Sequence, residues 1–482
     1  MATEPKTGRT TVEMHGVDTI PEDERTGRPR DLVGVLLGSN MSLGTVLFGW
    51  LPVSMGLGFW ASISAMIVGT LIGTALVTPL SVISMRTATN LSTSSGATFG
   101  VRGRLLGSAI GLLLALGYTA LIIWTGGGVV VLLLHRLAGI ADSATTYTAV
   151  YVVMAVLTIL VAVIGYHWVV RLNRWIVVGT AALMVLGVVA YAPHFTTGPI
   201  VDTYASGGFW PTWALAVVAV GISGPISYIT VLGDYTRYMS PRVVRPGAVC
   251  GATALGLFFG LFIPQLFGTF TALATQATDD YTGSLVSAAP AWLLVPLALS
   301  GLFGTLGNSS MLAYDMGLDL DAIVPRLRRT IATAIVAVAA TVLVFLGQFV
   351  WDAEDAITAF VLMLTTLGTP WAVITLIGHA QRRGNYDLDA LQIYNRRSRG
   401  GIYWYRGGWN SRATAAWTIG AAVGMLGIDT TLYRGPLLDY TGGIDLSFLL
   451  AAVTAGAIYL VLSPAPVVPD VMSAPVVEPA PS

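Results

Sequence analysis

Long apolar runs alternate with short polar loops along almost the whole chain. Runs of about twenty residues are long enough to cross the hydrocarbon core of a bilayer as helices. They predict twelve membrane spans, at approximately 32–58, 60–84, 104–134, 146–166, 172–193, 210–236, 246–274, 290–320, 330–350, 354–378, 412–431 and 444–462. The pattern therefore predicts an all-α polytopic membrane protein, with a single domain over 32–462.

Two of these spans contain residues that interrupt a helix near its middle. The first span carries Gly38-Ser39-Asn40, and the sixth carries Gly221-Ile222-Ser223-Gly224-Pro225. Each interruption falls in the first helix of a five-helix repeat, at 32–193 and 210–378, and two peripheral spans follow at 412–462. Backbone groups freed inside a bilayer are costly unless satisfied, so an unwound segment at that depth normally lines a cavity. We therefore predict a secondary transporter with its binding site at the two breaks.

The composition excludes most other classes of protein. Hydrophobic residues make up 54% of the 482 residues and charged residues 10%, and the mean hydropathy is +0.73, which is too apolar for a soluble fold of this length. The 25 basic and 25 acidic residues balance, which gives no electrostatic reason to expect a nucleic-acid partner. Cys250 is the single cysteine, which excludes an intrachain disulfide and a cysteine-based metal site.

The basic residues indicate how the chain is oriented. Of the 25 lysines and arginines, all but Arg136 and Arg434 fall before the first span, in alternate loops or at the ends of the spans beside them. Because such segments remain in the cytoplasm, we expect a cell-membrane protein with both termini cytoplasmic. The polar segment 1–31 lacks the apolar core of a signal peptide, and the Pro, Val and Ala-rich tail 463–482 is expected to be disordered.

Three sequence motifs carry a family resemblance. They are Val12–Val17 followed by Ile20–Thr26, then Gly233-Asp234-Tyr235-Thr236-Arg237-Tyr238 at the end of span six, and Arg383–Leu388 leading to Tyr403–Asn410. Taken in this order, the motifs resemble those of the nucleobase:cation symporters, in their purine-cytosine permease branch, over roughly residues 12–460. The resemblance implies the leucine-transporter-type fold, with two inverted five-helix repeats, two peripheral helices and discontinuous spans one and six. It also implies that spans one, two, six and seven rock against spans three, four, eight and nine.

The candidate substrate site combines aromatic and short polar residues. A neutral planar base needs a surface on which to stack and groups that match its edge of donors and acceptors. The predicted substrate-binding residues are Ser39, Asn40, Tyr118, Ser223, Gly224, Ser227, Asn308 and Ser310. The stacking role of Tyr118 and the base-contacting role of Asn308 are implied by the resemblance. Small residues such as Ser223 and Gly224 also permit close helix packing, and Tyr118 also suits a buried core.

Sodium and a proton are both candidates for the coupling ion. A sodium site would use the carbonyl of Gly38 in span one and oxygens of Asn308, Ser309 and Ser310 in span eight, because sodium is a hard cation that prefers oxygen ligands. The adjacent hydroxyl pair that relatives use is not found at the expected place. Asp315 supplies a titratable group in span eight, which favours a proton slightly. No other cofactor, no metal site and no obligate protein partner is expected.

The expected function is import of cytosine or a purine by cation symport and alternating access. The family often has tryptophan at the position of Tyr118, an amide at Ile122 and an aromatic residue at Pro225, so another small heterocycle remains an alternative, such as allantoin, hydantoin, a nucleoside or a vitamin. A polytopic membrane enzyme is less favoured, because the chain shows no Asp-rich metal motif, histidine pair or nucleophile with a base.

Overall fold

The computed structural model describes residues 18–164, 166–324, 329–350 and 353–463. Within these ranges, side chains are described except at 161–175, at 353–354 and at single positions between 310 and 333. The tail 464–482, for which disorder was expected, lies outside the described residues. The described chain is all helical and has a helix at each of the twelve predicted spans, so the predicted fold class is confirmed.

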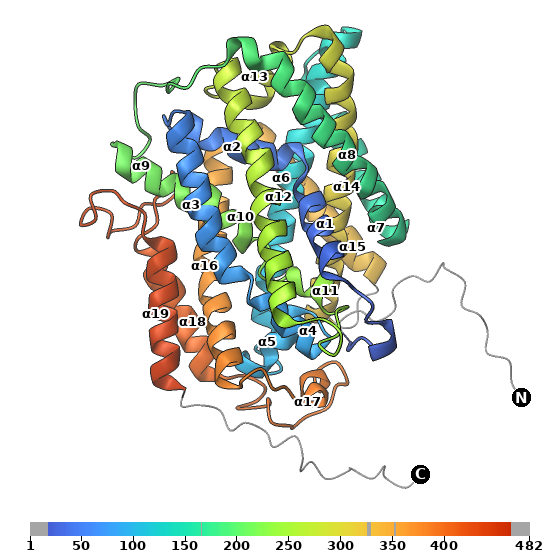
Figure 1. Ribbon diagram of the computed structural model, residues 1–482, viewed down its shortest axis with the longest axis vertical. Coiled ribbons are helices and arrows are strands. Elements are labelled where there is room, and N and C mark those ends of the chain that lie inside the picture. The colour runs from blue at the N-terminus through green and yellow to red at the C-terminus, as the bar shows by residue number, and fades with distance from the viewer. Residues whose placement is uncertain (1–17, 165, 325–328, 351–352, 464–482) are drawn as a thin grey trace, which may run out of the picture.

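The first half of the chain forms the first five spans (Figure 1). Its helices are η1 (Glu22–Glu24), α1 (Pro29–Asn40), α2 (Leu43–Ser54), α3 (Phe59–Val77), α4 (Leu80–Thr87), α5 (Leu91–Phe99), α6 (Leu105–Ala138), α7 (Ala144–Ile164), α8 (Tyr166–Tyr191) and η2 (Ala192–His194). The helices α1 and α2 together form span one, and α3 and α4 form span two. The short α5 lies between spans two and three.

The second half begins with a segmented sixth span. Its helices are α9 (Phe209–Ala216), the π-helix η3 (Val217–Ile222), α10 (Ser223–Ile226), α11 (Leu232–Thr236), α12 (Pro246–Thr275), α13 (Tyr281–Ser287), α14 (Ala291–Ile323), α15 (Arg329–Phe349), α16 (Ala353–Gln381), α17 (Leu388–Gln392), α18 (Ser411–Met425) and α19 (Ser447–Leu462). Among the described residues, seven helical stretches are long and apolar enough to cross a membrane, and the bent pair α1–α2 makes an eighth.

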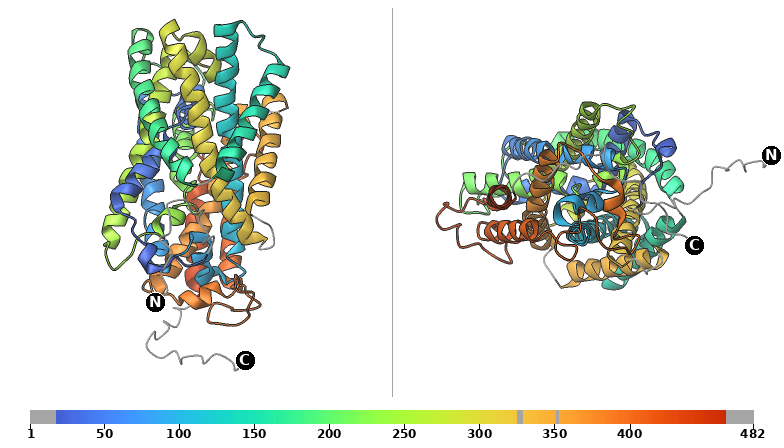
Figure 2. Two further views of the ribbon diagram at one scale, coloured as in Figure 1. Left: turned by 90° about the vertical axis from the view of Figure 1, so that its right-hand side faces the viewer. Right: turned by 90° about the horizontal axis from the view of Figure 1, so that it is seen from below.

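The helices pack as two groups with a peripheral pair. Contacts are dense among α1, α2, α3, η3 and α12, and again among α6, α7, α8, α14 and α15, but they are sparse between the two groups. The helices α18 and α19 pack against each other and against α16, on the opposite flank from α7 and α15 (Figures 1 and 2). The two groups are therefore two compact bodies with few contacts between them.

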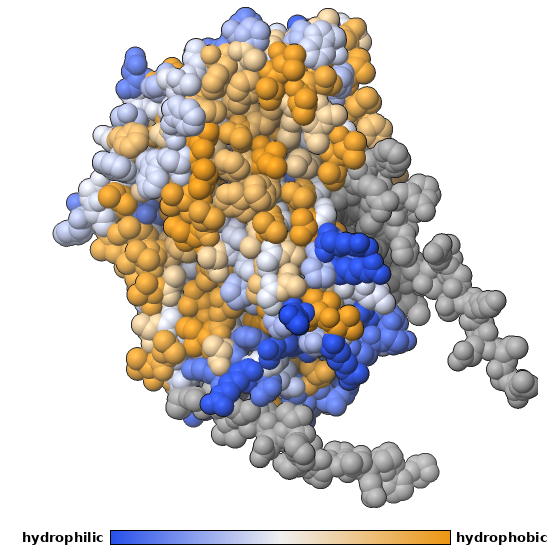
Figure 3. Space-filling model, viewed as in Figure 1, coloured by the Kyte–Doolittle hydropathy of each residue, from blue (hydrophilic) through white to orange (hydrophobic). Residues whose placement is uncertain are grey.

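The outer surface is suited to a bilayer. Large apolar side chains on the outward faces of the helices are exposed, among them Leu71, Val153, Val185 and Val461. Apolar residues cover most of the face seen in Figure 3, whereas strongly hydrophilic residues gather at the end from which both termini emerge. The chain is therefore a multi-pass membrane protein.

The break in span one lies just after its predicted place. Gly38, Ser39 and Asn40 form the last turn of α1, and the helix axis then bends by 64° before α2 begins at Leu43. Ser42 caps α2 by accepting a hydrogen bond from the backbone N–H of Thr45 at 3.3 Å. The polar side chain that interrupts the helix is therefore Ser42, which the sequence analysis did not select.

The predicted break in span six is wrong. Gly221 and Ile222 end the π-helix η3, Ser223 to Pro225 are α-helical, and the helix is interrupted only later, in the turn 227–231. Gly221 instead allows close packing, because a Cβ on it would lie 2.5 Å from the Cα of Gly69 on α3. Pro225 in turn packs against Gly73, where a Cβ would lie 3.0 Å from the proline ring. The small residues here bring two helices together, as is common in membrane proteins.

Candidate functional site

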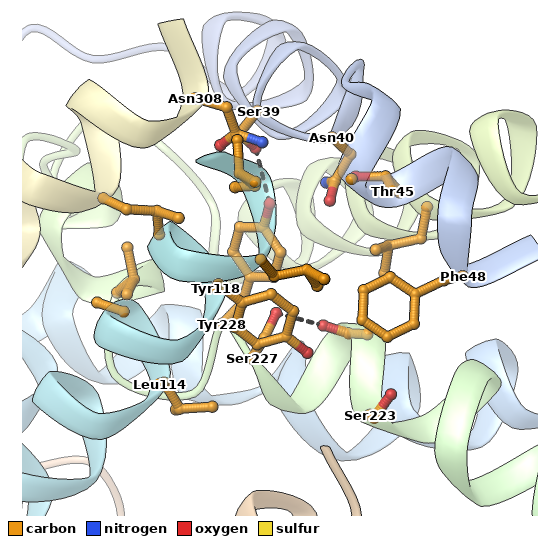
Figure 4. A pocket seen from close by; sticks show the side chains of 18 of the residues that line it. Ser39, Asn40, Thr45, Phe48, Leu114, Tyr118, Ser223, Ser227, Tyr228 and Asn308 are labelled. Carbon is orange, nitrogen blue, oxygen red and sulfur yellow. Dashed lines mark hydrogen bonds between the residues drawn. The ribbon is translucent and has the colours of Figure 1, made fainter. Parts of the chain in front are cut away.

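A cavity lies between the two interrupted spans, at the boundary of the two groups of helices (Figure 4). Its volume, measured for the centre of a water molecule, is about 70 Å³. Since one water needs only about 10–15 Å³ on this measure, the cavity has room for a small ring. Seven of the eight predicted substrate-binding residues line it, namely Ser39, Asn40, Tyr118, Ser223, Gly224, Ser227 and Asn308. The side chain of Ser310, on α14, is outside the described part.

The end of α1 contributes a hydroxyl and an amide to the cavity. The hydroxyl oxygens of Ser39 and Tyr228 lie 2.8 Å apart, which links α1 to the turn that follows α10. Asn40 donates its amide N–H to the carbonyl of Leu36 at 2.8 Å, which fixes the orientation of its side chain. The two interrupted spans are therefore joined by a hydrogen bond at the cavity wall.

Asn308 joins span eight to the break in span one. Its Nδ2 donates a hydrogen bond to the hydroxyl of Ser42, at 3.2 Å. Because this bond uses a donor of the amide, the oxygen of Asn308 keeps its acceptor capacity for another group. Asn308 is half-buried and lines the cavity, so a ligand there can reach it.

Aromatic rings form one wall of the cavity. The ring of Tyr118 on α6 lies between Phe48 on α2, with centroids 6.0 Å apart, and Phe360 on α16, with centroids 5.6 Å apart. Figure 4 shows Tyr118, Tyr228 and Phe48 around the same space. Rings at these distances form a rigid apolar surface, which suits stacking by a planar ligand.

Span six contributes small polar residues. Ser223 donates its hydroxyl to the carbonyl of Ala219 at 2.5 Å, and Ser227 donates to the carbonyl of Gly224 at 2.6 Å. Their hydroxyl oxygens keep acceptor capacity on the cavity side. A Cβ on Gly224 would approach Leu261 of α12 to 3.1 Å, so this position favours glycine.

Gln265 on α12 lies in the cavity but is not among the residues predicted from the sequence. This residue is 1% exposed and lines the cavity, and its Oε1 has no hydrogen-bond partner among the described residues. Its Nε2 makes only a long contact of 3.5 Å with the carbonyl of Val220. An unpaired buried amide oxygen costs about 1–3 kcal/mol, which a ligand donor would offset. The signal available in the sequence was a lone amide within the apolar run 246–274. Thr45, Phe48, Tyr228 and Tyr235 line the cavity and were also missed.

The lining residues of the cavity carry no charge. Its described lining has hydroxyls, amides, aromatic rings and aliphatic side chains, but no acidic residue, lysine, arginine or histidine. A charged ligand would lose its hydration there without gaining a counter-charge. The cavity is therefore matched to a neutral, planar and polar-edged molecule.

The predicted cation-coupling residues are spread over more than one place. The carbonyl of Gly38 accepts a hydrogen bond from the N–H of Met41 at 3.2 Å, and Asn308 lies close to the same break. Ser309 lies elsewhere, because its hydroxyl donates to the carbonyl of Thr305 and is 2.8 Å from the hydroxyl of Thr158 on α7. The side chain of Asp315 lies outside the described residues.

Described parts of all three sequence motifs meet at the end that carries the termini. We call this surface, made of residues 18–28, α4, α5, α11 and the loop 382–410, the terminal cap. Arg25 is 8% exposed and donates to the carbonyls of Arg237, Met85 and Met239, which joins the N-terminal segment to spans two and six. Val12–Val17, the first part of the first motif, lies outside the described residues.

The loop motif closes the cap over α5. Tyr405 donates its hydroxyl to the carbonyl of Ala97 at 2.8 Å, and Asn410 donates its amide to that of Thr98 at 2.7 Å. Arg104, 1% exposed, donates to the hydroxyl of Thr93 at 3.0 Å and to Asn395. Burial lowers the pKa of Arg104 to about 10, so it remains protonated at neutral pH. The described parts of the motifs thus hold segments together at this end, and Tyr235 of the second motif also lines the cavity.

Comparison with known proteins shows one family over most of the chain. Residues 19–451 match the family described as permease for cytosine/purines, uracil, thiamine, allantoin. The chain is 24% identical over 473 residues to the "Putative purine-cytosine permease YxlA" of Bacillus subtilis (strain 168), covering 94% of this chain and 96% of that one.

Solved structures show the same fold. Mhp1, a nucleobase-cation-symport-1 family transporter, in a closed conformation with bromovinylhydantoin bound, has a TM-score of 0.72 at 16% identity, covering 94% of this chain and 95% of that one. Inward-facing Mhp1 has a TM-score of 0.75 at 16% identity, with 94% of each chain covered. A sodium-coupled sialic acid symporter in an outward-open state has a TM-score of 0.54 at 14% identity, covering 93% of this chain and 90% of that one. These likenesses confirm the predicted transporter fold.

Proposed function

Because the chain belongs to the permease family for cytosine/purines, uracil, thiamine and allantoin, we propose that it imports cytosine or a purine by cation symport. Membership makes it a multi-pass membrane transporter rather than an enzyme. The observation that supports a nucleobase is the uncharged cavity, which combines the Tyr118 wall with the amides of Asn308 and Gln265. Such a site offers both a stacking surface and groups for a polar edge.

In the proposed binding mode, the base stacks on Tyr118 and its edge meets the two amides. The oxygens of Asn308 and Gln265 would accept hydrogen bonds from ring or exocyclic N–H groups, and the hydroxyls of Ser223 and Ser227 offer further acceptors in the same cavity. Because these residues come from both groups of helices, a bound base stabilises the arrangement in which the groups approach each other. It does so only by its higher affinity for that arrangement.

We propose that the protein lies in the cell membrane with both termini in the cytoplasm. The support is the distribution of arginine, which is concentrated in the terminal cap and the other loops at the same end. Transport toward the terminal cap is then import. The bundle of α1, α2, α3, η3 and α12 would move against the group containing α6 and α14.

The coupling cation is proposed to be a proton rather than sodium. A sodium site between spans one and eight needs several oxygen ligands around one point. Ser309 lies beside Thr158 of α7, whereas Gly38 and Asn308 lie near the break in span one, so the described candidate oxygens do not gather around one point. Among the described residues of span eight, Asn308 is then the one whose side-chain oxygen lies near the break in span one.

Uptake competition tests the substrate class. Cells or proteoliposomes that contain the protein should accumulate labelled cytosine or a labelled purine, and unlabelled bases should compete. Leucine and glutamate should not compete, because the cavity offers no counter-charge for a zwitterion. Strong competition by an amino acid, with none by any base, would overturn the proposal.

A second candidate is a transporter of another neutral heterocycle. The family description names thiamine and allantoin, and the structural neighbour Mhp1 binds bromovinylhydantoin. The same cavity would accommodate a hydantoin-like ring, because it also has a flat face and an edge of N–H and C=O groups. Allantoin, hydantoin, a nucleoside and thiamine should therefore be included in the uptake competition. The class of compound that competes most strongly then decides between a nucleobase transporter and a transporter of another heterocycle.

A further inference from the structure

A buried carboxyl group lies between the cavity and the terminal cap. Leu312 of α14 lines the cavity, and Asp319 follows on the same helix about 10 Å farther toward the cap, at 1.5 Å per residue. The helix α6 follows the same course, because Ala115 lines the cavity and Gly111, one turn closer to the cap, contacts Asp319. Asp319 therefore lies where a path from the cavity to the terminal side would open.

The surroundings of Asp319 are tight and only weakly polar. Its side chain is 6% exposed, and its hydrogen-bond partner is the hydroxyl of Ser92 on α5, at a long 3.5 Å. A Cβ on Gly111 would collide with Oδ2 of Asp319 and would lie 2.9 Å from the hydroxyl of Thr230. Thr230 is 3% exposed, and its hydroxyl has no hydrogen-bond partner in the described part of the chain.

Few polar groups surround Asp319. The helices α5 and α6 present Ser92 and Gly111, and the turn 227–231 presents Thr230. The described titratable group within electrostatic range is a second carboxyl, Asp234 of α11, which has interaction partners of its own. The helices α7, α8 and α15 also pack on α14, but no described lysine, arginine or histidine forms an ion pair with Asp319. An ionised carboxylate buried in this way is costly unless a cation accompanies it.

Asp319 also lies across the boundary between the moving parts. It belongs to α14, which packs with α6, while Thr230 and Asp234 belong to the lower part of span six, where α11 packs with α4. Separating these parts would bring water to the carboxyl and move it away from Asp234. Closing them would again remove water from the carboxyl, and a protonated, neutral carboxyl avoids the cost of burying a charge.

We propose that Asp319 is the proton-binding group of this transporter. It is neutral while the terminal side is closed, and it releases its proton to the terminal side when the turn 227–231 and α11 move away. Ser92 then donates to the carboxylate that forms. This inference rests on the proposed symport and adds the residue that couples proton and substrate.

Proteoliposomes test the inference with cytosine, or with whichever base competes best, as the probe. With one proton per substrate, a pH gradient of one unit sustains about a tenfold accumulation of the base by the wild-type protein. Asp319→Asn keeps the shape but holds no exchangeable proton, so accumulation should fall to about onefold. Exchange of internal for external base at equal pH should continue, because it needs no net proton movement. Full accumulation by Asp319→Asn would overturn the inference.

A second buried carboxyl provides the matched control. Asp445 precedes α19 and is 3% exposed, and it accepts hydrogen bonds from the backbone N–H groups of Asp429 and Ser447, both at 2.8 Å. Asp445→Asn loses one of these two hydrogen bonds, because the backbone N–H groups donate to different carboxylate oxygens, but it should keep the tenfold accumulation because Asp445 lies beside the peripheral helices rather than at the boundary of the two groups. Accumulation driven by sodium alone in the wild type would reject the proton while leaving the substrate proposal standing. Failure of the wild type to exchange any base would instead reject the proposed function.

A second variant covers the case in which Asp319→Asn does not fold. Asp319→Glu keeps the titratable group but pushes it toward Gly111, so the pH at which exchange is half-maximal should shift relative to the wild type. Size-exclusion chromatography shows whether each variant is folded. An Asp319→Glu protein with the wild-type pH profile would contradict the inference, because the group that titrates would then lie elsewhere.

Discussion

The cavity and the terminal cap differ in how their polar groups are satisfied. In the cap, buried arginines such as Arg25 and Arg382 donate to backbone carbonyls of several segments, so their guanidinium groups hold these segments together. In the cavity, the amide oxygen of Gln265 has no partner in the described residues, and Asn308 bonds only through its nitrogen. The difference teaches that most of the recognisable motif residues hold segments together at the cap, whereas Gln265 and Asn308, which lie outside the motifs, carry the amide oxygens that are open to a ligand.

The largest expected effect comes from breaking the cap. Arg382 is 3% exposed and donates to the hydroxyl of Thr98 at 3.0 Å, to the carbonyl of Gly378 at 2.8 Å and to that of Ala97. Arg382→Gln leaves several of these acceptors unpaired and should lower stability by about 3 kcal/mol. Thermal unfolding in detergent measures the loss.

An exposed arginine in the same loop serves as the control for Arg382. Arg396 forms a solvent-exposed ion pair with Asp389 at 2.9 Å. Because exposed pairs contribute little, Arg396→Gln should change stability by less than about 1 kcal/mol. Equal losses for the two variants would show that the buried network is not what stabilises the cap.

The next effect concerns the cavity and should appear in binding. Asn308→Leu removes the amide that faces the ligand, which should weaken binding of the transported base by about 1–3 kcal/mol, or roughly 5- to 150-fold. The dissociation constant can be measured by scintillation proximity with labelled base. Unchanged affinity in a folded variant would remove Asn308 from the site.

Gln265 tests the comparison because its substitution should weaken ligand binding without lowering the stability of the ligand-free protein. Gln265→Met keeps the shape of the side chain but removes an amide oxygen that has no partner in the described structure. The variant should therefore bind base about tenfold more weakly, while the ligand-free protein keeps its thermal midpoint or gains slightly. A falling midpoint without loss of affinity would place Gln265 in the structural network instead.

The smallest effect is a pH dependence of the cap. A hydrogen bond from the hydroxyl of Ser240, and then the nearby Arg25, lower the pKa of Glu22 below its ordinary value of 4.5. A lowered pKa means that the ionised form is stabilised by folding, so this contribution is present above about pH 4.5 and is lost as the pH falls through the folded pKa. The effect is small because Glu22 is largely solvated.

Hydrogen exchange of residues 18–28 measures this dependence. Protection of the segment should decrease slightly on acidification, and Glu22→Gln should remove most of the change. A protection that increases on acidification would have the wrong sign for the contacts with Ser240 and Arg25.

The sequence predicted the spans well because a bilayer demands long apolar helices of nearly fixed length. It predicted the gathering of Tyr118, Ser223 and Asn308 at one cavity, because breaks in spans one and six limit where a site can lie. The position of the second break was wrong, since glycine has two uses, and Gly221 serves contact with Gly69. A run of small residues is typical both of close helix packing and of an unwound segment, so the sequence alone does not distinguish the two.

Other residues could not be chosen from sequence alone. Gln265 and Asp319 are single polar residues in long helices, and the direction in which each points depends on the packing of those helices. Asp315 and Asp319 lie one turn apart, so their sequence context is nearly the same. Burial against Gly111 and Ser92 distinguishes Asp319, and this contact joins segments far apart in the chain.

The π-helix from Val217 to Ile222 has a consequence for how this site can change through evolution. A π-helix accommodates one more residue than an α-helix over the same turn, and loss of that residue would rotate the following segment by about 100°. Ser223 and Ser227 follow directly, so a single deletion would turn new side chains toward the cavity while α9 kept its place. Span six thus carries a position at which one deletion would change the contacts made by Ser223 and Ser227 while those of Tyr118, Gln265 and Asn308, on other helices, stayed in place.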